Sequence, residues 1–353
     1  MIRSLLVKSA LAGALSLAAV TAQAAELKVM LDWFINPDHG PLFVAEERGY
    51  FKDAGLEVTL QPPADPNDPP KLVAAGKYDL AVSYQPQLHL QIDAGLPLVR
   101  IATLVATPLN TIVVLKDSPI KTIADLKGKR IGIPEWSQTA TVYARGWLHH
   151  QGGVKLDEVE WVQAGVNAPG RVEMAKLNLP AGVKYTQVAD KSLAEMLLSG
   201  EIDCMISAHP PHEFENGAMT RLMPDFREVE ESYFEETGIY PIMHTVAIKR
   251  DVYEEYPWIA RNLMTAFEEA RDRSVERLTS VTASQIPVPW GYVNAEKTAS
   301  KIFGDNGVWP YGIEPSRTTI EAFLQYCDEQ GVTHRKLTPE ELYAPEATTE
   351  FII

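Results

Sequence analysis

Apolar and polar residues follow two alternating patterns along the chain, one typical of buried strands and one typical of helices with a single apolar side. Short apolar runs predict strands at residues 27–33, 56–60, 79–84, 111–116, 159–165 and 202–208. Helical spacing predicts helices at residues 41–51, 67–76, 137–153, 191–200, 257–278 and 315–331. Because strands and helices alternate, we expect an α/β fold with mostly parallel sheets.

One unit of helix and strand occurs twice. Residues 72–86 (LVAAGKYDLAVSYQP) match residues 196–210 (MLLSGEIDCMISAHP) at a constant spacing. The identical pairs are Gly76 and Gly200, Asp79 and Asp203, Ser83 and Ser207, and Pro86 and Pro210. A weaker similarity joins residues 27–33 to residues 129–136, since both segments read as strands that end in an acidic residue and a tryptophan. The repeat indicates two similar α/β lobes.

The repeat also predicts where a ligand binds. Ligands of open α/β sheets bind beyond the carboxyl ends of the strands, and these ends fall here into two sets, one in each lobe. Two facing lobes would enclose a cleft and close on the ligand by a hinge. We expect residues 25–116 and 240–353 to form a discontinuous first lobe, and residues 117–239 to form the second.

The first 24 residues have the order of a secretory signal peptide. Arg3 and Lys8 precede an apolar run that ends at Val20, and small residues follow up to Ala24. A membrane anchor is the alternative, but the run is shorter than the ~20 residues that a spanning helix needs. We expect cleavage after Ala24 and export to the periplasm of a Gram-negative bacterium.

The composition is that of an ordinary globular protein, with 46% hydrophobic and 22% charged residues. The formal net charge of −15 argues against binding to nucleic acid, which needs a basic surface, and favours a neutral or small ligand. Cys204 and Cys327 are far apart in the sequence, and we expect two unpaired thiols. The sequence has no G-x-S-x-G, H-E-x-x-H or P-loop motif, so no catalytic residue and no cofactor are expected.

The segment LDWFINPDHGPLFVAEERGYFKDAGLEV resembles the thiamine-pyrimidine group of solute-binding proteins. The resemblance covers roughly residues 26–130, and it is carried by Trp33, Asn36, Pro37 and His39 in one loop, followed by DPNDPPKLVAAGK. It implies the type II periplasmic binding protein fold. In that fold two doubly wound α/β sheets are joined by a hinge, and the ligand cleft lies between the lobes.

From about Arg130 the resemblance changes. The segments IGIPEWSQTATVYARGWL, APGR and GEIDCMISAHPP resemble the 4,5-dihydroxyphthalate decarboxylase family, over about residues 130–347. That family shares the two-lobed fold, but it is described as enzymatic and lacks an export signal. The two-part pattern has two interpretations, a natural lineage or a fusion of two sequence types.

In the first lobe, the candidate ligand-binding residues stand in two loops at strand ends. Trp33 is expected to stack on a planar ring and His39 to form a hydrogen bond with it. The resemblance supports both, because this loop faces the ligand in the pyrimidine-binding relatives. Asp38 either contacts the ligand together with them or only caps a helix. Tyr84 and Gln85 suit a flat polar ligand, unless they only form the turn before the next proline.

In the second lobe, a helix is expected to begin at residues 135–139, where free backbone N–H groups suit a carboxylate. The candidates there are Glu135, Trp136, Ser137 and Thr139. Ser137 also fits the part of a plain N-cap. Glu135 would oppose an anion, so its expected partner is a ligand hydroxyl or a cation. Arg171 is either a clamp for a carboxylate or a solvated loop residue.

The stretch GEIDCMISAHPPHEF holds three potential metal ligands, Cys204, His209 and His212. The repeat aligns Cys204 with an interior strand position, so we expect it in the core, away from both histidines, and expect no metal site. His209 aligns with a position already assigned to the cleft, and His209 and His212 are candidates for the ligand-facing loop. His244 lies on an apolar strand near the return crossing, and it is either structural or part of the hinge or cleft.

These observations favour a monomeric periplasmic solute-binding subunit of an ABC importer. It would capture a small aromatic or pyrimidine-like ligand, of the thiamine-precursor or phthalate type, and present it to a membrane permease. One alternative is a decarboxylase of 4,5-dihydroxyphthalate-like acids, in which histidines and Arg171 would stabilise charge on the ring. Another is a pyrimidine-synthesis protein like the yeast relatives, in which a histidine is consumed as substrate and His39 occupies the comparable loop. The export signal argues against both.

Overall fold

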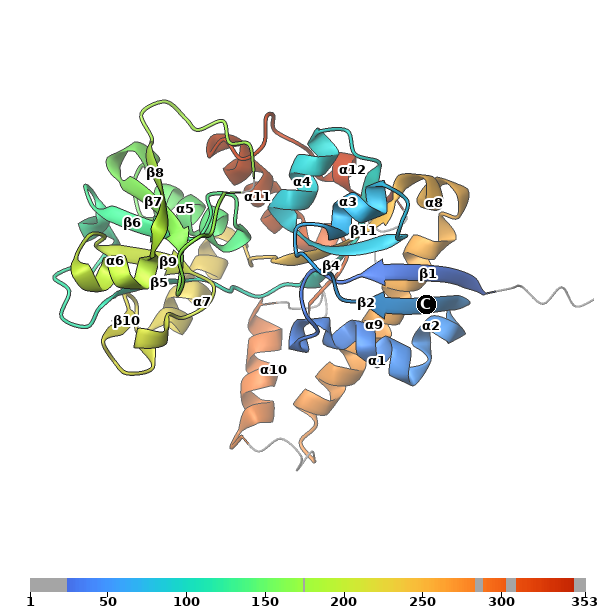
Figure 1. Ribbon diagram of the computed structural model, residues 1–353. Helices are drawn as coiled ribbons and strands as arrows, with labels where there is room; N and C mark the ends of the chain where they lie inside the picture. The colour runs from blue at the N-terminus through green and yellow to red at the C-terminus, as the bar shows by residue number, and fades with distance from the viewer. Residues whose placement is uncertain (1–23, 174, 283–287, 303–308, 346–353) are drawn as a thin grey trace, which may run out of the picture.

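The computed structural model describes residues 24–173, 175–282, 288–302 and 309–345, which form two lobes, each built on one sheet (Figure 1). The expected signal peptide lies outside the described residues, except for Ala24. The first sheet has the order β2-β1-β3-β11-β4, with bounds Leu56–Gln61, Ala25–Met30, Leu80–Tyr84, His244–Lys249 and Leu98–Val105. The second has the order β10-β5-β9-β6-β7-β8, with bounds Met219–Arg221, Thr111–Leu115, Cys204–Ser207, Arg130–Ile133, Glu160–Gly165 and Lys184–Ser192.

Helices cover both faces of each sheet. On the first sheet, one face packs against α1 (Gly40–Arg48), α2 (Tyr50–Asp53) and α9 (Trp258–Thr279), and the other against α3 (Pro69–Ala74) and α4 (Gln85–Asp93). On the second sheet, α5 (Thr139–His150) and α6 (Leu193–Ser199) lie on opposite faces. The remaining helices named here are α7 (Phe226–Thr237), α8 (Arg250–Glu255), α10 (Gly291–Ile302), α11 (Arg317–Glu329) and α12 (Pro339–Leu342). Both sheets are therefore doubly wound, as expected.

The sequence repeat is confirmed in the register of the two sheets. The paired residues are Val29 with Leu80 and Met30 with Ala81 in the first sheet, and Ile131 with Cys204 and Gly132 with Met205 in the second. The repeated aspartates make the same bond in both lobes. Asp79 Oδ2 accepts from the Lys28 backbone N–H at 2.8 Å, and Asp203 Oδ2 accepts from the Arg130 N–H at 2.8 Å. The carboxylate ties the start of its own strand to the neighbouring strand in each lobe.

The weaker similarity between residues 27–33 and 129–136 is out of register by one residue. The sheet pairing matches Met30 with Gly132, so Trp33 corresponds to Glu135 and not to Trp136. Both tryptophans lie beyond the ends of their strands, and Trp33 is 41% exposed, whereas Trp136 is fully buried.

The chain crosses between the lobes after β4 and again before β11. β5 pairs with β9 and β10 in the second sheet, so the first crossing runs through residues 106–110. The expected lobe boundary after residue 116 therefore falls one strand too late. The apolar runs before and after the crossing resemble one another, so the pattern of residues does not mark it. β11 lies antiparallel to both β3 and β4 on its return.

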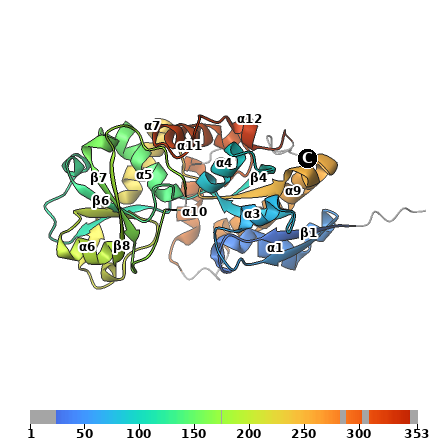
Figure 2. The ribbon, with the colours of Figure 1, turned by 45° about the horizontal axis from the view of Figure 1, so that its top comes forward.

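A C-terminal segment, residues 317–344, joins the two lobes (Figures 1 and 2). On the second lobe, the Gln330 side chain donates to the Val142 carbonyl at 2.9 Å and accepts from Arg145 Nε at 2.9 Å. On the first lobe, the Ala344 N–H donates to the Arg100 carbonyl at 2.9 Å. The segment thus connects the lobes in addition to the two crossings.

Both cysteines are buried and unpaired, Cys204 in β9 and Cys327 in α11, as expected. Burial raises the pKa of both thiols. α4 begins at Gln85 directly after β3, where the sequence pattern suggested a turn. Within the described ranges, the helices lack a stretch both long and apolar enough to cross a bilayer.

His89 on α4 makes the fold sensitive to acid. Its ring is fully buried, neither ring nitrogen has a hydrogen-bond partner among the described residues, and burial together with the charge of Arg100 holds its pKa well below the ordinary value. A histidine with a lowered folded pKa is protonated first in the unfolded chain, so stability is lost as the pH falls below about 6.5.

We therefore expect the His89→Met variant, which keeps apolar contact with Phe323 on α11, to lose less stability on acidification. Between pH 7.5 and pH 5 the loss should be smaller by about 2 kcal/mol. Urea unfolding at the two pH values measures it, with the exposed His149→Met as control. Equal losses in the two variants would contradict the prediction.

Candidate functional site

A buried polar cluster lies at the carboxyl ends of the first-lobe strands. Asp32 follows β1, His39 ends the short 3-10 helix Pro37–His39, and His244 opens β11. His39 Nε2 lies 2.7 Å from Asp32 Oδ1, and His244 Nδ1 lies 3.6 Å from Asp32 Oδ2. Asp32 and His39 are almost completely buried, and His244 is 8% exposed. Asp32 Oδ2 and His244 Nδ1 have no hydrogen-bond partner among the described residues.

The cluster keeps a negative charge on Asp32. Burial alone would raise its pKa, but the hydrogen bond from His39, followed by electrostatic interaction with His244 and His39, lowers it below the ordinary value. Burial lowers the pKa of His244, against the attraction of Asp32. His244 is therefore neutral near pH 7, and the hydrogen bond from His39 is the interaction that keeps Asp32 ionised. His39 Nδ1 accepts from the Asn36 N–H at 3.4 Å, which places the ring proton on Nε2.

Tyr84, the last residue of β3, extends this cluster towards the second lobe. Its ring meets that of His244 edge to face, with 4.9 Å between the ring centres. Burial first, and then the charge of Asp32, raise the pKa of Tyr84, while Arg171 and Glu135 of the second lobe also act on it. Tyr84 is thus close enough to Arg171 and Glu135 of the second lobe for their charges to act on it.

The loop after β1 leaves three large apolar side chains exposed. Trp33 is 41% exposed, and Phe34 and Ile35 are more so. Trp33 and Phe34 contact one another with 5.8 Å between their ring centres. Asp38 is half-buried and does not cap the helix, since Asn36 accepts the hydrogen bond from its N–H at 2.9 Å. This loop provides aromatic faces beside the polar cluster.

Gln85 lies in the hinge. It is fully buried, its Nε2 donates to the Ile242 carbonyl at 2.6 Å and to the Tyr143 hydroxyl at 3.3 Å, and its Oε1 accepts from Arg100 at 2.8 Å. These bonds join α4, α5 and the return crossing. All its polar atoms are in use, so Gln85 has a structural role in this conformation.

On the second-lobe side, Glu135 and Arg171 form an ion pair at 2.7 Å. Glu135 is largely covered, and burial raises its pKa against the opposing charge of Arg171. The Arg171 side chain is 43% exposed. Glu135 is therefore already neutralised by a protein cation, and Arg171 presents its free face to solvent.

The loop just before α5 binds a carboxylate of the protein. Glu173 Oε2 accepts from the Trp136 N–H at 2.5 Å and from the Ser137 N–H at 3.2 Å, and its Oε1 accepts from the Ser137 hydroxyl at 2.5 Å. Two of the backbone groups expected to bind a ligand carboxylate thus bind an internal one, and both precede the N-cap residue. Gln138, and not Ser137, is the N-cap residue of α5.

The other two candidates near this helix face inwards. Trp136 is fully buried, its Nε1 donates to the Gln330 carbonyl at 2.8 Å, and the Arg145 guanidinium lies 3.9 Å from the centre of its ring. Thr139 is 4% exposed, and its hydroxyl has no partner among the described residues. Trp136 packs between the second lobe and the C-terminal segment.

His209 and His212 are exposed in the loop after β9. The His212 N–H donates to Asn167 Oδ1 at 3.1 Å, while Cys204 is buried inside its strand. Across residues 24–345, leaving aside the undescribed gaps, no group of three histidine, cysteine, aspartate or glutamate side chains is placed to hold a metal ion.

Sequence reasoning missed two residues, Asp32 and Glu173. Asp32 could have been found, because it is an acidic residue at the carboxyl end of a central strand, next to the Trp33 that was chosen. Glu173 carries no such signal, since its partners lie 36 or more residues earlier in the chain.

Removing Glu173 should open an anion site. In the Glu173→Ala variant the Trp136 and Ser137 N–H groups lose their acceptor, and we expect a loss of about 1–2 kcal/mol of stability. Acetate should restore part of that loss, because a small carboxylate can replace the missing one. Thermal unfolding in acetate and in chloride of equal ionic strength tests this, with the exposed Glu47→Ala as control. An equal response to acetate in both variants would contradict it.

Comparison with known proteins gives one family and one fold. The family described as NMT1/THI5 like matches residues 36–174. A 4,5-dihydroxyphthalate decarboxylase from Comamonas testosteroni is 32% identical over 233 residues, which cover 65% of this chain and 70% of that protein. A protein from Haemophilus influenzae named for thiamine biosynthesis is 36% identical over 250 residues, covering 69% of this chain and 68% of that protein.

Among solved structures, the periplasmic aliphatic sulphonate binding protein SsuA from Escherichia coli superposes with a TM-score of 0.57 at 15% identity. The match covers 93% of this chain and 94% of that one. At this identity the likeness concerns the fold alone, and it agrees with the two doubly wound sheets described above. Together these findings show that the chain belongs to the NMT1/THI5-like family and has the two-lobed type II periplasmic binding protein fold.

Proposed function

We propose that the chain is a periplasmic solute-binding subunit of an ABC importer, which captures a small aromatic or pyrimidine-like ligand by closing its lobes. One observation carries the proposal: the Asp32, His39, His244 and Tyr84 cluster at the first-lobe strand ends is within electrostatic reach of Glu135 and Arg171 of the second lobe. We call these six residues, with Trp33, the interlobe site.

The interlobe site suits a flat ring with polar edges. The exposed faces of Trp33 and Phe34 can stack on the ring. Asp32 Oδ2 can accept from an amino group, and the neutral His244 can donate or accept at the ring edge. Closure would bring Arg171 onto the ligand from the other side, and a ligand that contacts both lobes stabilises the closed state.

The carboxylate of Glu173, bound just before α5, affects which class of ligand the second lobe can accept. Glu173 accepts from the Trp136 and Ser137 N–H groups, and Arg171 is paired with Glu135, so each of these groups already has a carboxylate partner. This supports a neutral amino-substituted ring over a phthalate-type diacid. The relative named for thiamine biosynthesis supports the same choice.

Isothermal titration with 4-amino-5-hydroxymethyl-2-methylpyrimidine and with 4,5-dihydroxyphthalate tests the proposal. We expect heat with the pyrimidine, and a smaller radius of gyration by X-ray scattering when it is bound. Absence of heat with both compounds would overturn the solute-binding role. Heat without a change in the scattering would overturn hinge closure.

Export and the permease partner are part of the same proposal. Residues 1–23 lie outside the described residues, and the support for cleavage after Ala24 is the signal-peptide pattern. Mass spectrometry of protein from a periplasmic extract should find Ala25 as the first residue. Recovery of an intact N-terminus would exclude export with cleavage after Ala24.

A second candidate is a decarboxylase of dihydroxyphthalate-like acids. The observation that favours it is the similarity to a decarboxylase over 70% of that protein's length, combined with a buried Asp–His pair beside a tyrosine. Release of carbon dioxide from 4,5-dihydroxyphthalate by the purified protein would favour this function over the transport role.

A further inference from the structure

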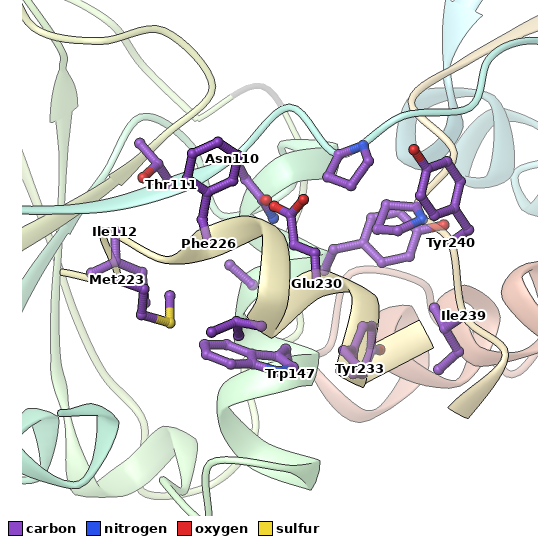
Figure 3. A pocket seen from close by; sticks show the side chains of 15 residues that line it. Asn110, Thr111, Ile112, Trp147, Met223, Phe226, Glu230, Tyr233, Ile239 and Tyr240 are labelled. Atoms are coloured by element: carbon purple, nitrogen blue, oxygen red, sulfur yellow. The ribbon is translucent and has the colours of Figure 1, made fainter. Parts of the chain in front are cut away.

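A pocket lies away from the interlobe site, on the second lobe and the hinge. Figure 3 shows it between α5 and α7, with both crossings of the chain at its edge. Pro108 and Asn110 line it from the first crossing, Thr111 from the start of β5, and Ile239, Tyr240 and Pro241 from the second crossing. No residue of the interlobe site lines it. We call it the α7 pocket.

The walls of the α7 pocket are mainly apolar and aromatic. Trp147 and Tyr143 contribute from α5, and Phe226 and Tyr233 from α7. The cavity has a volume of about 100 Å³, somewhat below the 150 Å³ or so of an apolar protein cavity that binds benzene. Its size suits a single aromatic ring with a short substituent that reaches the opening.

Glu230 is the one charged side chain that lines the α7 pocket, and no lysine, arginine or histidine accompanies it in the lining. In Figure 3 it extends from α7 towards Asn110 and Phe226. Within the described ranges it forms no hydrogen bond or ion pair. Burial raises its pKa to about 7, and the charge of Arg221, which lies over the Phe226 ring, acts in the opposite sense.

Two neighbouring carboxylates of α7, unlike Glu230, form ion pairs. Glu231 pairs with Arg227 at 2.8 Å and with Lys301 at 2.8 Å, and Glu235 also pairs with Lys301 at 2.8 Å. Glu231 and Glu235 are therefore paired with surface cations, whereas the pocket-facing Glu230 forms no ion pair among the described residues, although the charge of Arg221 reaches it. A carboxylate in an aromatic pocket without a partner is complementary to an organic cation.

We propose that the α7 pocket binds a small aromatic ammonium ion, with the ring between the side chains of α5 and α7 and the ammonium group against Glu230. The site is independent of the interlobe site and of its ligand. Its occupant would touch both crossings, and the hydroxyl of Tyr143 in the pocket wall accepts from the Ile242 N–H at 3.2 Å. Binding there would therefore act on the hinge itself.

Benzylammonium, with benzyl alcohol and benzoate as uncharged and oppositely charged counterparts, tests the proposal. Titration followed by NMR at pH 8 should show binding of benzylammonium, at least fivefold weaker binding of benzyl alcohol and none of benzoate. The Glu230→Gln variant should bind benzylammonium at least tenfold more weakly. Glu228→Gln, an exposed acid of the same helix, should be unchanged.

The pH dependence of the unaltered protein gives a second measurement that needs no variant. Between pH 8 and pH 6 the ionised fraction of Glu230 falls about tenfold, and the affinity for benzylammonium should fall with it. The other ionisable groups that face Glu230 are Arg221 of β10, Tyr143 of α5, Tyr233 of α7 and Tyr240 of the crossing. Burial raises the pKa of each of the three tyrosines, so all three stay protonated over this range. The proposal would be overturned if the affinity for benzylammonium did not depend on pH, or if benzyl alcohol bound as tightly. It would also be overturned if Glu230→Gln bound benzylammonium as tightly as the unaltered protein, or if the unaltered protein did not bind it at about 10 mM.

Discussion

The Asp32→Asn variant is expected to bind its ligand about 10- to 100-fold more weakly than the unaltered protein, because a hydrogen bond to a charged group contributes about 1.5–3 kcal/mol. Asparagine keeps the volume of the side chain and can still accept from His39. What it loses is the negative charge that the His39 hydrogen bond maintains and that an amino group of the ligand would meet at Oδ2.

Isothermal titration with 4-amino-5-hydroxymethyl-2-methylpyrimidine measures this loss. Asp53→Asn, an exposed change of the same type, is the control and should leave the affinity unchanged. Far-UV circular dichroism and unfolding curves separate a loss of affinity from a loss of fold. If folded Asp32→Asn binds within threefold of the unaltered protein, Asp32 is not part of the ligand site.

The Gly331→Ala variant is expected to lose about 3 kcal/mol of stability, among the larger effects of a single substitution. Gly331 follows α11 with a φ of +66°, and an added Cβ would lie 1.8 Å from the Asn178 carbonyl oxygen. The obstacle is backbone, which cannot rotate away as a side chain can. The hydrogen bond from the Asn178 N–H to the Gly331 carbonyl at 2.9 Å would also be displaced.

Gly153→Ala is a matched control for this variant. Gly153 has a similar φ of +62° but nothing within 4 Å of its Cβ position, so alanine there should cost only the ~1 kcal/mol of a left-handed backbone. Urea unfolding of the two variants isolates the effect of the contact. Equal losses would mean that the C-terminal segment adapts without strain.

Much of the fold could be predicted because both lobes carry the same local sequence signals. Gly76 and Gly200 end their helices, Asp79 and Asp203 start the next strands, and both carboxylates hold the neighbouring strand. Such signals are local, within about 15 residues, and survive in the sequence as a repeat. The position of the first crossing could not be predicted in the same way, because β4 and β5 are both apolar and only the pairing decides which sheet each one joins.

Residues of the candidate site could be predicted where a polar or aromatic side chain stands at the end of a strand, and not elsewhere. His39 and Tyr84 stand in such positions, and the structure places them in one cluster with His244. Gln85 stands there too, but the buried Arg100 and the return crossing use all its polar atoms. Glu173 reaches the start of α5 from a separate loop, and nothing in the local sequence indicates which backbone groups it will meet.

The discontinuous first lobe has a consequence for the order of folding. β11 lies between β3 and β4, so the first sheet stays incomplete until residues 244–249 are available, and the Arg100 backbone gains its partners Tyr343 and Ala344 later still. The strands of the second sheet all fall within residues 111–221 and need no later segment to pair. A chain that emerges N-terminus first would therefore complete its second sheet before its first. Until then, the β3 edge remains open to pairing with other chains, which makes the first lobe the part most exposed to aggregation.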